Sequence, residues 1–211
     1  MLPYRYVVVE GPVGVGKSSL VSRLADYMKA DIVTDPAAQN PFLARFYQDR
    51  KHYALPTQLH FLLGRGEISR QLLDPTRYTG PIVSDFMFER DALFAHLCLA
   101  EDELQLYRAL QQKVLPEYPA PDLMIYLQAP TEVLTRRIAE NGVAYERDFP
   151  EGYLRRIENT YSEFFHLYET APLLIVNTEN LNFVDNDDDF ELLVARIHNM
   201  RGKRSYFNKS T

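Results

Sequence analysis

The chain has 211 residues, of which 46% are hydrophobic and 25% charged, a composition typical of one globular α/β domain that spans residues 1–211. Its net charge of −6 argues against broad binding to nucleic acid or to an anionic membrane, because both partners need a basic surface. A single cysteine, Cys98, excludes an intrachain disulfide, and neither a signal pattern nor a membrane-length apolar run is present, so we expect a cytoplasmic protein.

Apolar runs alternate with helical spacings along the chain. We expect five strands, at residues 4–10, 31–34, 82–85, 122–128 and 173–176. We expect helices at residues 17–29, from 40 onward, and at 55–73, 90–99, 101–115, 131–140, 153–168 and 190–200. The alternation predicts a parallel sheet covered on both faces, with ligands at the carboxyl ends of its strands. Residues 142–152 lack periodicity and are expected to form a lid, and residues 201–204 a solvent-exposed end.

The segment between the first strand and the first helix is rich in glycine. Gly11 to Ser18 match G-x-x-x-x-G-K-[ST], the phosphate-binding P-loop, and the alternative is an accidental glycine turn. Glycines let backbone N–H groups point at phosphate oxygens, Lys17 can reach the terminal phosphates, and the Ser18 hydroxyl can bind Mg²⁺. We therefore predict a P-loop NTPase-type three-layer α/β/α domain with a five-stranded parallel sheet. The expected nucleotide-binding residues here are Gly11, Pro12, Val13, Gly14, Val15, Gly16, Lys17, Ser18 and Ser19.

Three acidic residues, Glu10, Asp35 and Asp85, lie at or just beyond predicted strand ends. A P-loop enzyme needs a carboxylate near its metal ion and, if it phosphorylates a hydroxyl, a base for the proton. Asp85 suits the role of metal ligand, and Asp35 suits the role of the base that takes the proton. The alternative is that each is an ordinary strand-end or turn acid.

Two further polar clusters allow two interpretations each. Arg136, Arg137 and Arg147 flank the predicted lid and could close over transferring phosphates, or form a solvated helix face. Asn186 to Asp189 resemble a metal-binding loop but lack calcium-loop spacing, so we favour a helix cap.

Further spaced motifs extend from Arg5 to about Met200. They are Asp35-Pro36 after the second strand, Tyr47 and Gln58 in the helical region that follows, Arg65 and Asp91, Glu146 in the lid, and Asn182-Phe183 after the last strand. By these residues the chain resembles the deoxynucleoside kinase family, and most closely its bacterial deoxyadenosine/deoxyguanosine kinase-like members.

The resemblance implies roles at the acceptor side. Asp35 would accept the proton of the 5′-hydroxyl, Tyr47 would contact the sugar, and Gln58 would pair with the base. Arg65 and Asp91 would lie as a pair over the base edge. Such a pair goes with purine or cytosine substrates more than with thymidine.

The resemblance also implies a donor and a partner. Glu146 would hold the 3′-hydroxyl, and Asn182 and Phe183 would pack on the adenine of the phosphate donor, ATP with Mg²⁺. The family pairs through helices like those at 42–73 and 90–115, so we expect a homodimer.

The third strand departs from the family pattern, which has Glu/Asp-Arg-Ser at its end. With Asp85 as the acid, Asp91 keeps its expected spacing, but Phe86 replaces the arginine. The alternative register, Glu89-Arg90, restores an arginine and displaces Asp91. We prefer the Asp85 register.

The sequence therefore predicts a kinase that transfers the γ-phosphate of ATP to the 5′-hydroxyl of a deoxynucleoside. Its substrate would be deoxyadenosine or deoxyguanosine, with deoxycytidine as a further candidate, and Lys17, Asp35 and Arg137 would be catalytic. One alternative is a nucleoside monophosphate kinase such as thymidylate kinase, which would need basic residues around the acceptor phosphate. The other is a degenerate nucleotide-binding structural or regulatory subunit, which Phe86 favours.

Overall fold

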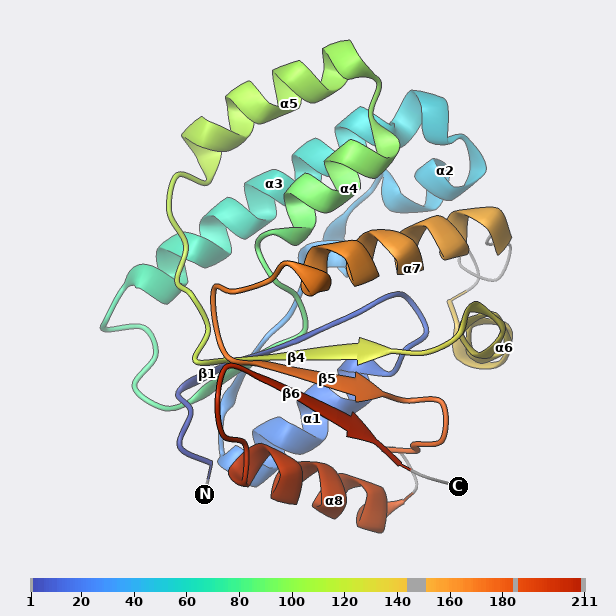
Figure 1. Cartoon of the computed structure of the whole chain (residues 1–211). Coiled ribbons are helices and arrows are strands. Elements are labelled where there is room, and N and C mark those ends of the chain that lie inside the picture. The colour runs from blue at the N-terminus through green and yellow to red at the C-terminus, as the bar shows by residue number, and fades with distance from the viewer. Residues whose placement is uncertain (1, 144–150, 184–185, 210–211) are drawn as a thin grey trace. The chain divides into compact units, whose positions relative to one another are not determined.

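All the strands that the structure describes belong to one parallel sheet. The computed structural model describes residues 2–143, 151–183 and 186–209. The strands are β1 (Tyr6–Glu10), β2 (Asp31–Val33), β3 (Ile82–Ser84), β4 (Leu123–Gln128), β5 (Leu173–Asn177) and β6 (Arg204–Asn208), in the order β2-β3-β1-β4-β5-β6 (Figure 1). Val8 of β1 pairs with Ser84 on one side and Met124 on the other. The carboxyl ends of β1, β3 and β4 therefore meet at one edge, as in other parallel sheets.

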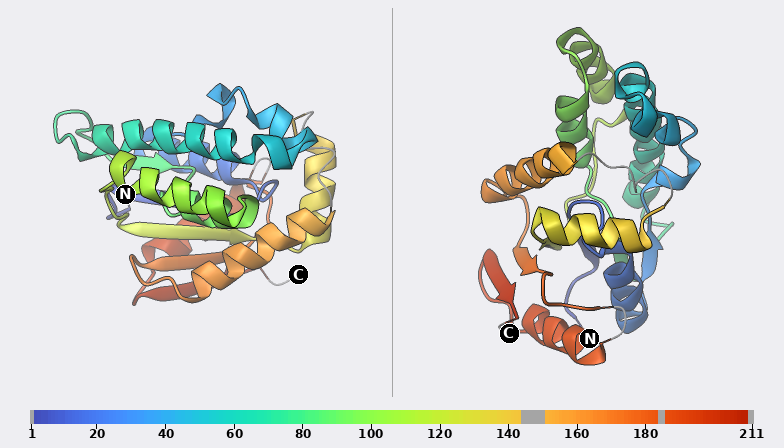
Figure 2. Two further views of the ribbon diagram at one scale, coloured as in Figure 1. Left: turned by 90° about the horizontal axis from the view of Figure 1, so that it is seen from above. Right: turned by 90° about the vertical axis from the view of Figure 1, so that its right-hand side faces the viewer.

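The chain divides into two compact units, of which the first contains the sheet and comprises residues 1–33, 80–85 and 120–211. Helices α1 (Lys17–Met28) and α8 (Asp187–His198) cover one face of the sheet, and α7 (Glu151–His166) covers the other (Figures 1 and 2). Helix α6 (Thr131–Asn141) lies near the carboxyl ends of the strands (Figure 1). Buried aliphatic residues of the strands and of α1 and α8 form the core. Three layers of this kind follow from strands whose side chains are buried on both faces.

The second unit comprises residues 34–79 and 86–119 and is helical. It contains a 3₁₀ turn (Pro36–Gln39), α2 (Leu43–Gln48), α3 (Arg50–Leu73), α4 (Arg90–Cys98) and α5 (Glu101–Val114), with α3 packed against α4 and α5. Glycine inside α3 has a packing reason, because a Cβ at Gly66 would lie 2.8 Å from the Val114 carbonyl oxygen. The prediction of a single domain stays a prediction.

The fold class is confirmed as three-layer α/β with a parallel sheet, but the prediction of five strands is wrong. The predicted strands correspond to β1–β5, whereas Arg204, expected in an exposed end, begins a sixth strand that pairs with β5 from Leu173↔Arg204 onward. The segment Arg204–Asn208 is short and largely polar, so no apolar run marks it. Backbone pairing with β5 holds this strand in the sheet.

Among the helices that the structure describes, none combines the length and the hydropathy needed to cross a membrane.

Candidate active site

The P-loop connects β1 to α1 in a conformation that requires glycine. Gly11 and Gly14 have φ angles of 153° and 80°, which L side chains rarely adopt. A Cβ at Gly11 would lie 2.4 Å from the Leu127 carbonyl oxygen, and one at Gly14 would lie 2.7 Å from Cγ1 of Ile138. The loop is therefore packed closely against the end of β4 and against α6.

The first turn of α1 presents the groups that bind phosphate in a P-loop. Gly16 precedes it with no side-chain cap, and no acidic residue occurs in that turn, so its amides face no competing carboxylate there. Lys17 Nζ lies across the loop and donates to the carbonyl oxygens of Gly11 and Pro12 at 2.8 and 2.9 Å. This arrangement holds a positive charge beside the loop that the motif predicts to bind phosphate.

A buried carboxylate at the end of β1 accepts a hydrogen bond from the first residue of the P-loop. Glu10 is the last residue of β1 and is 0% exposed, and its Oε1 accepts hydrogen bonds from Gly11 N–H at 2.8 Å and from the Tyr161 hydroxyl of α7 at 3.0 Å. Burial, together with Glu158 and Glu10, raises the pKa of the neighbouring Tyr126. No specific role of Glu10 is predicted from the sequence, although a charged residue at the end of a buried strand is a signal that points to one.

Ser18 and Asp85 are the predicted metal ligands. Ser18 lies in the first turn of α1, and Asp85 directly follows β3, the strand beside β1. Among the described residues, no group of three or more His, Cys, Asp or Glu side chains could hold a metal ion. One hydroxyl and one carboxylate suit Mg²⁺ that arrives with a nucleotide, because Mg²⁺ takes its other ligands from phosphates and water.

Arg137 lies in α6 and hydrogen-bonds to the segment that follows β5. Its guanidinium donates to the hydroxyl and the carbonyl of Thr178, just beyond β5, at 3.0 and 2.6 Å. Burial and the neighbouring Arg136 lower its pKa. Arg136 itself is exposed. Glu146 and Arg147, with most of the predicted lid, lie outside the described residues.

The loop after β5 contains the predicted adenine contact. Asn182 N–H donates to Oδ2 of Asp189 at 2.8 Å, and the Phe183 ring is 4% exposed within the core. Asn186 caps α8, because its side chain accepts from the N–H groups of Asp188 and Asp189. The interpretation of this acidic cluster as a helix cap is confirmed.

In the helical unit, Asp35 meets two guanidinium groups. Arg65 Nη2 of α3 donates to both carboxylate oxygens at 2.9 Å, and Arg90 Nη1 of α4 donates to Oδ2 at 3.2 Å. Arg65 also pairs with the fully buried Asp91. The structure thus brings together Asp35, Arg65 and Asp91 from the predicted site. It also adds Arg90, which the sequence indicated only through the alternative reading of Glu89-Arg90 as the family motif.

Burial and charge pairing act in opposite directions on the ionisation of this cluster. Burial alone would lower the pKa of Arg65, but Asp35 and Asp91 outweigh it and raise the pKa. Burial raises the pKa of Asp91, against the opposing effect of Arg65. The Arg65 guanidinium also lies 5.0 Å from the ring centre of Phe61 and 5.5 Å from that of Phe86. Arg65 is therefore fixed by two carboxylates and two aromatic rings.

Tyr47 and Gln58, which the sequence predicts to contact the nucleoside, lie on α2 and α3. Gln58 is 3% exposed and lies on the buried side of α3, as does Arg65. Tyr47 of α2 is half-buried, with its ring 5.6 Å from that of Phe46. Both residues belong to the unit that contains Asp35.

Replacing Asp91 by alanine is expected to destabilise the protein by about 3 kcal/mol, because it leaves a buried guanidinium with one carboxylate fewer. Urea unfolding measures the change. Glu67→Ala is the matched control: it removes the partner of Arg70 on the same α3, where both side chains are exposed, so the loss should be much smaller. Equal losses of unfolding free energy in the two variants would contradict the view that Asp91 compensates the buried charge of Arg65.

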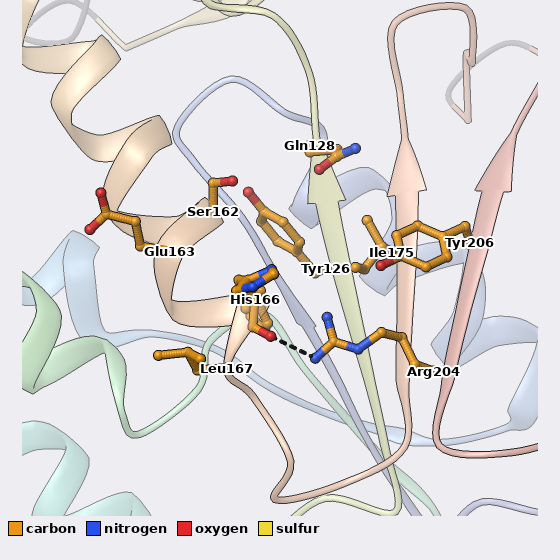
Figure 3. Close-up of a pocket in the computed structure, with 10 residues that line it drawn as sticks. Tyr126, Gln128, Ser162, Glu163, His166, Leu167, Ile175, Arg204 and Tyr206 are labelled. Atoms are coloured by element: carbon orange, nitrogen blue, oxygen red, sulfur yellow. Dashed lines mark hydrogen bonds between the residues drawn. The ribbon is translucent and has the colours of Figure 1, made fainter.

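A cavity of about 560 Å³ lies elsewhere in the sheet unit, between α7 and strands β4–β6 (Figure 3). Tyr126, Arg204 and Tyr206 line it, and Arg204 donates to the His166 carbonyl at 3.2 Å. Its lining contains none of the predicted site residues.

The fold and the loop after β1 define a P-loop NTPase-type protein. The family model described as "Deoxynucleoside kinase" matches residues 7–201. The chain belongs to the deoxynucleoside kinase family, and its relatives include curated deoxyguanosine and deoxyadenosine/deoxycytidine kinases, which are phosphotransferases.

The chain resembles several characterised members over most of its length. It is 26% identical to the deoxyguanosine kinase of Bacillus subtilis, across 91% of this chain and 95% of that protein. It is 28% identical to the deoxyadenosine kinase of Lactobacillus acidophilus, across 85% and 88%. The structure of a deoxyadenosine kinase from M. mycoides, with the products dCMP and a flexible dCDP bound, superposes with a TM-score of 0.79 at 21% identity and covers 92% of this chain and 100% of that one.

Proposed function

We propose that the protein transfers the γ-phosphate of ATP, with Mg²⁺, to the 5′-hydroxyl of a purine deoxynucleoside. The observation that carries the proposal is the charge balance around Asp35. Within the contacts that the structure describes, two carboxylates, Asp35 and Asp91, meet two guanidiniums, Arg65 and Arg90, so these four charges balance. An uncharged nucleoside suits a neutral cluster, whereas a nucleoside monophosphate would need an excess of positive charge.

The donor would bind in the sheet unit. The P-loop amides and Lys17 would hold the β- and γ-phosphates, and Ser18 and Asp85 would hold Mg²⁺, which supplies charge neutralisation at the phosphates. Arg137 is proposed to stabilise the transferring phosphoryl group, after its guanidinium turns away from Thr178. Asn182 and Phe183 are proposed to flank the adenine, with Phe183 contributing its backbone because its ring is in the core.

The acceptor would bind in the helical unit. Asp35 would take the hydroxyl proton, Tyr47 would contact the sugar, and Gln58 with Arg65 and Asp91 would read the base. Glu146, beyond the described residues, is proposed to hold the 3′-hydroxyl.

Deoxyadenosine or deoxyguanosine is expected to exceed thymidine in kcat/KM by at least about 10²-fold, because a site built to hydrogen-bond one base edge rejects bases that leave its buried polar groups unpaired. Purified protein with Mg-ATP is assayed against four deoxynucleosides and four deoxynucleoside monophosphates. Deoxycytidine is the next substrate we expect after the purines.

Other outcomes of the same panel support the alternatives. Preferred turnover of a monophosphate would favour a thymidylate kinase-like activity. Absence of turnover on every substrate would favour a degenerate nucleotide-binding subunit. A clear thymidine preference would contradict the proposed roles of Gln58, Arg65 and Asp91.

We also propose a homodimer in a cytoplasmic setting. Leu63 of α3 and Leu106 of α5 are 61% and 51% exposed, in the helices through which the family resemblance implies pairing. Exposed large apolar side chains of this kind favour contact with another protein surface. The lone cysteine, Cys98, suits a reducing compartment.

A further inference from the structure

Arg90 is the first residue of α4, and its side chain reaches Asp35. The Arg90 and Asp35 side chains are each only 12% exposed, with Nη1 and Oδ2 3.2 Å apart. The Arg90 guanidinium also lies 5.5 Å from the centre of the Phe94 ring, one turn further along α4. A cation largely withdrawn from water needs a compensating charge. The contact with Asp35 provides such a charge.

The segment between β3 and α4 brings no other cation to Asp35. Phe86 is 0% exposed, and its ring packs 5.3 Å from the Phe88 ring and 5.5 Å from the Arg65 guanidinium carbon. Arg90 is the one basic residue between positions 86 and 91. The aromatic side chain at position 86 therefore fills space beside the cluster, and the charge comes from the start of α4.

Arg65 and Arg90 hold Asp35 in different ways. Arg65 engages both carboxylate oxygens and is itself fixed by Asp91 and by two aromatic rings. Arg90 contacts Oδ2 through Nη1. Arg65 therefore connects the Asp35 carboxylate to Asp91 and to the buried aromatic rings, whereas Arg90 places a second cation at Oδ2 of Asp35.

We propose that Arg90 is a positioning residue that orients the Asp35 carboxylate and keeps it ionised for proton transfer. This inference rests on the proposed function. In the reaction the hydroxyl O–H bond breaks and the proton moves to an Asp35 oxygen. The hydroxyl oxygen bonds to the γ-phosphorus as the bond from that phosphorus to the bridging oxygen breaks, and the departing nucleoside diphosphate keeps the electron pair. Arg90 stays protonated throughout.

The pH dependence follows from the groups that face this carboxylate. Among the described residues they include Arg65 from α3 and Arg90 and Asp91 from α4, with Tyr107 of α5 beside Asp91. Arg90→Ala removes a cation that contacts Asp35 Oδ2, so Asp35 takes up a proton at higher pH. The acid limb of the kcat/KM profile should move up by about one pH unit. We expect kcat to fall about 10- to 100-fold, a loss typical of removing a group that orients a reacting side chain.

The test compares Arg90→Ala with Arg90→Lys and with Arg70→Ala, a control in α3 whose side chain is 64% exposed. Arg90→Lys should recover most of kcat and the wild-type acid limb, while Arg70→Ala should change neither. If Arg90→Ala keeps the wild-type kcat and acid limb while the wild type turns over a deoxynucleoside, the inference about Arg90 is wrong and the proposed function stands.

A second measurement does not depend on turnover. The side-chain carboxyl carbons of aspartate are labelled with ¹³C and titrated by NMR, and the Asp35 signal is assigned as the one lost in Asp35→Asn. Arg90→Ala should move the Asp35 midpoint to higher pH, and Arg90→Lys should not. An unmoved midpoint overturns the inference whatever the activity. A wild type that is inactive on the whole panel overturns the proposed function, and with it the role of Arg90 in transfer.

Discussion

Lys17→Ala is expected to abolish detectable phosphate transfer, a loss of at least about 10³-fold in kcat. Lys17 Nζ lies against the carbonyl oxygens of Gly11 and Pro12, so its charge is held over the loop that would receive the β- and γ-phosphates. Charge that develops on the transferring phosphoryl group needs a fixed cation, and water replaces such a cation poorly. The kcat is measured with saturating deoxynucleoside and ATP.

The protein should stay folded in this variant, because Lys17 contributes polar contacts at the start of α1 and its backbone is unchanged. Circular dichroism and thermal melting check this point. Lys113→Ala, near the end of α5 where the side chain is exposed, is the matched control and should keep wild-type turnover. Turnover near the wild-type level in Lys17→Ala would contradict the P-loop assignment.

Asp35→Asn should lower kcat by ~10²–10⁴, the usual contribution of a general base. This corresponds to roughly 2.7–5.5 kcal/mol of activation free energy. Asparagine keeps the size of aspartate and much of its hydrogen bonding, but it cannot take a proton from the sugar hydroxyl. ATP affinity, measured by titration, should barely change, because the P-loop sets it.

The matched control for this variant is Asp49→Asn. Asp49 is the N-cap of α3, where its side chain accepts from His52 N–H at 3.3 Å, and asparagine caps helices equally well. Asp49→Asn should therefore keep wild-type kcat. If Asp35→Asn behaves in the same way, Asp35 is a turn residue and the base is unassigned. Because Asp35 pairs with Arg65 and Arg90, thermal melting of the variant separates lost chemistry from lost stability.

Much of the fold follows from local sequence patterns. The strands β1, β3, β4 and β5 contain apolar runs, and α1 and α8 carry apolar residues at helical spacing, so their positions could be predicted to within a few residues. Helix starts were less accurate. α3 begins at Arg50 because Asp49 caps it, and this capping residue precedes the apolar positions on which the prediction depended. β6 was missed because its polar sequence becomes a strand only by pairing with β5.

The P-loop and the helix after it follow from local sequence, because the motif is contiguous and its glycines set the backbone geometry of the turn. The partners of the acidic residues depend instead on tertiary packing. Glu10 meets Tyr161, and Asp35 meets Arg90, across long stretches of chain that no spacing rule connects. Such contacts depend on which helix packs beside which strand or helix. A buried charge then takes whichever partner that packing places within hydrogen-bond reach.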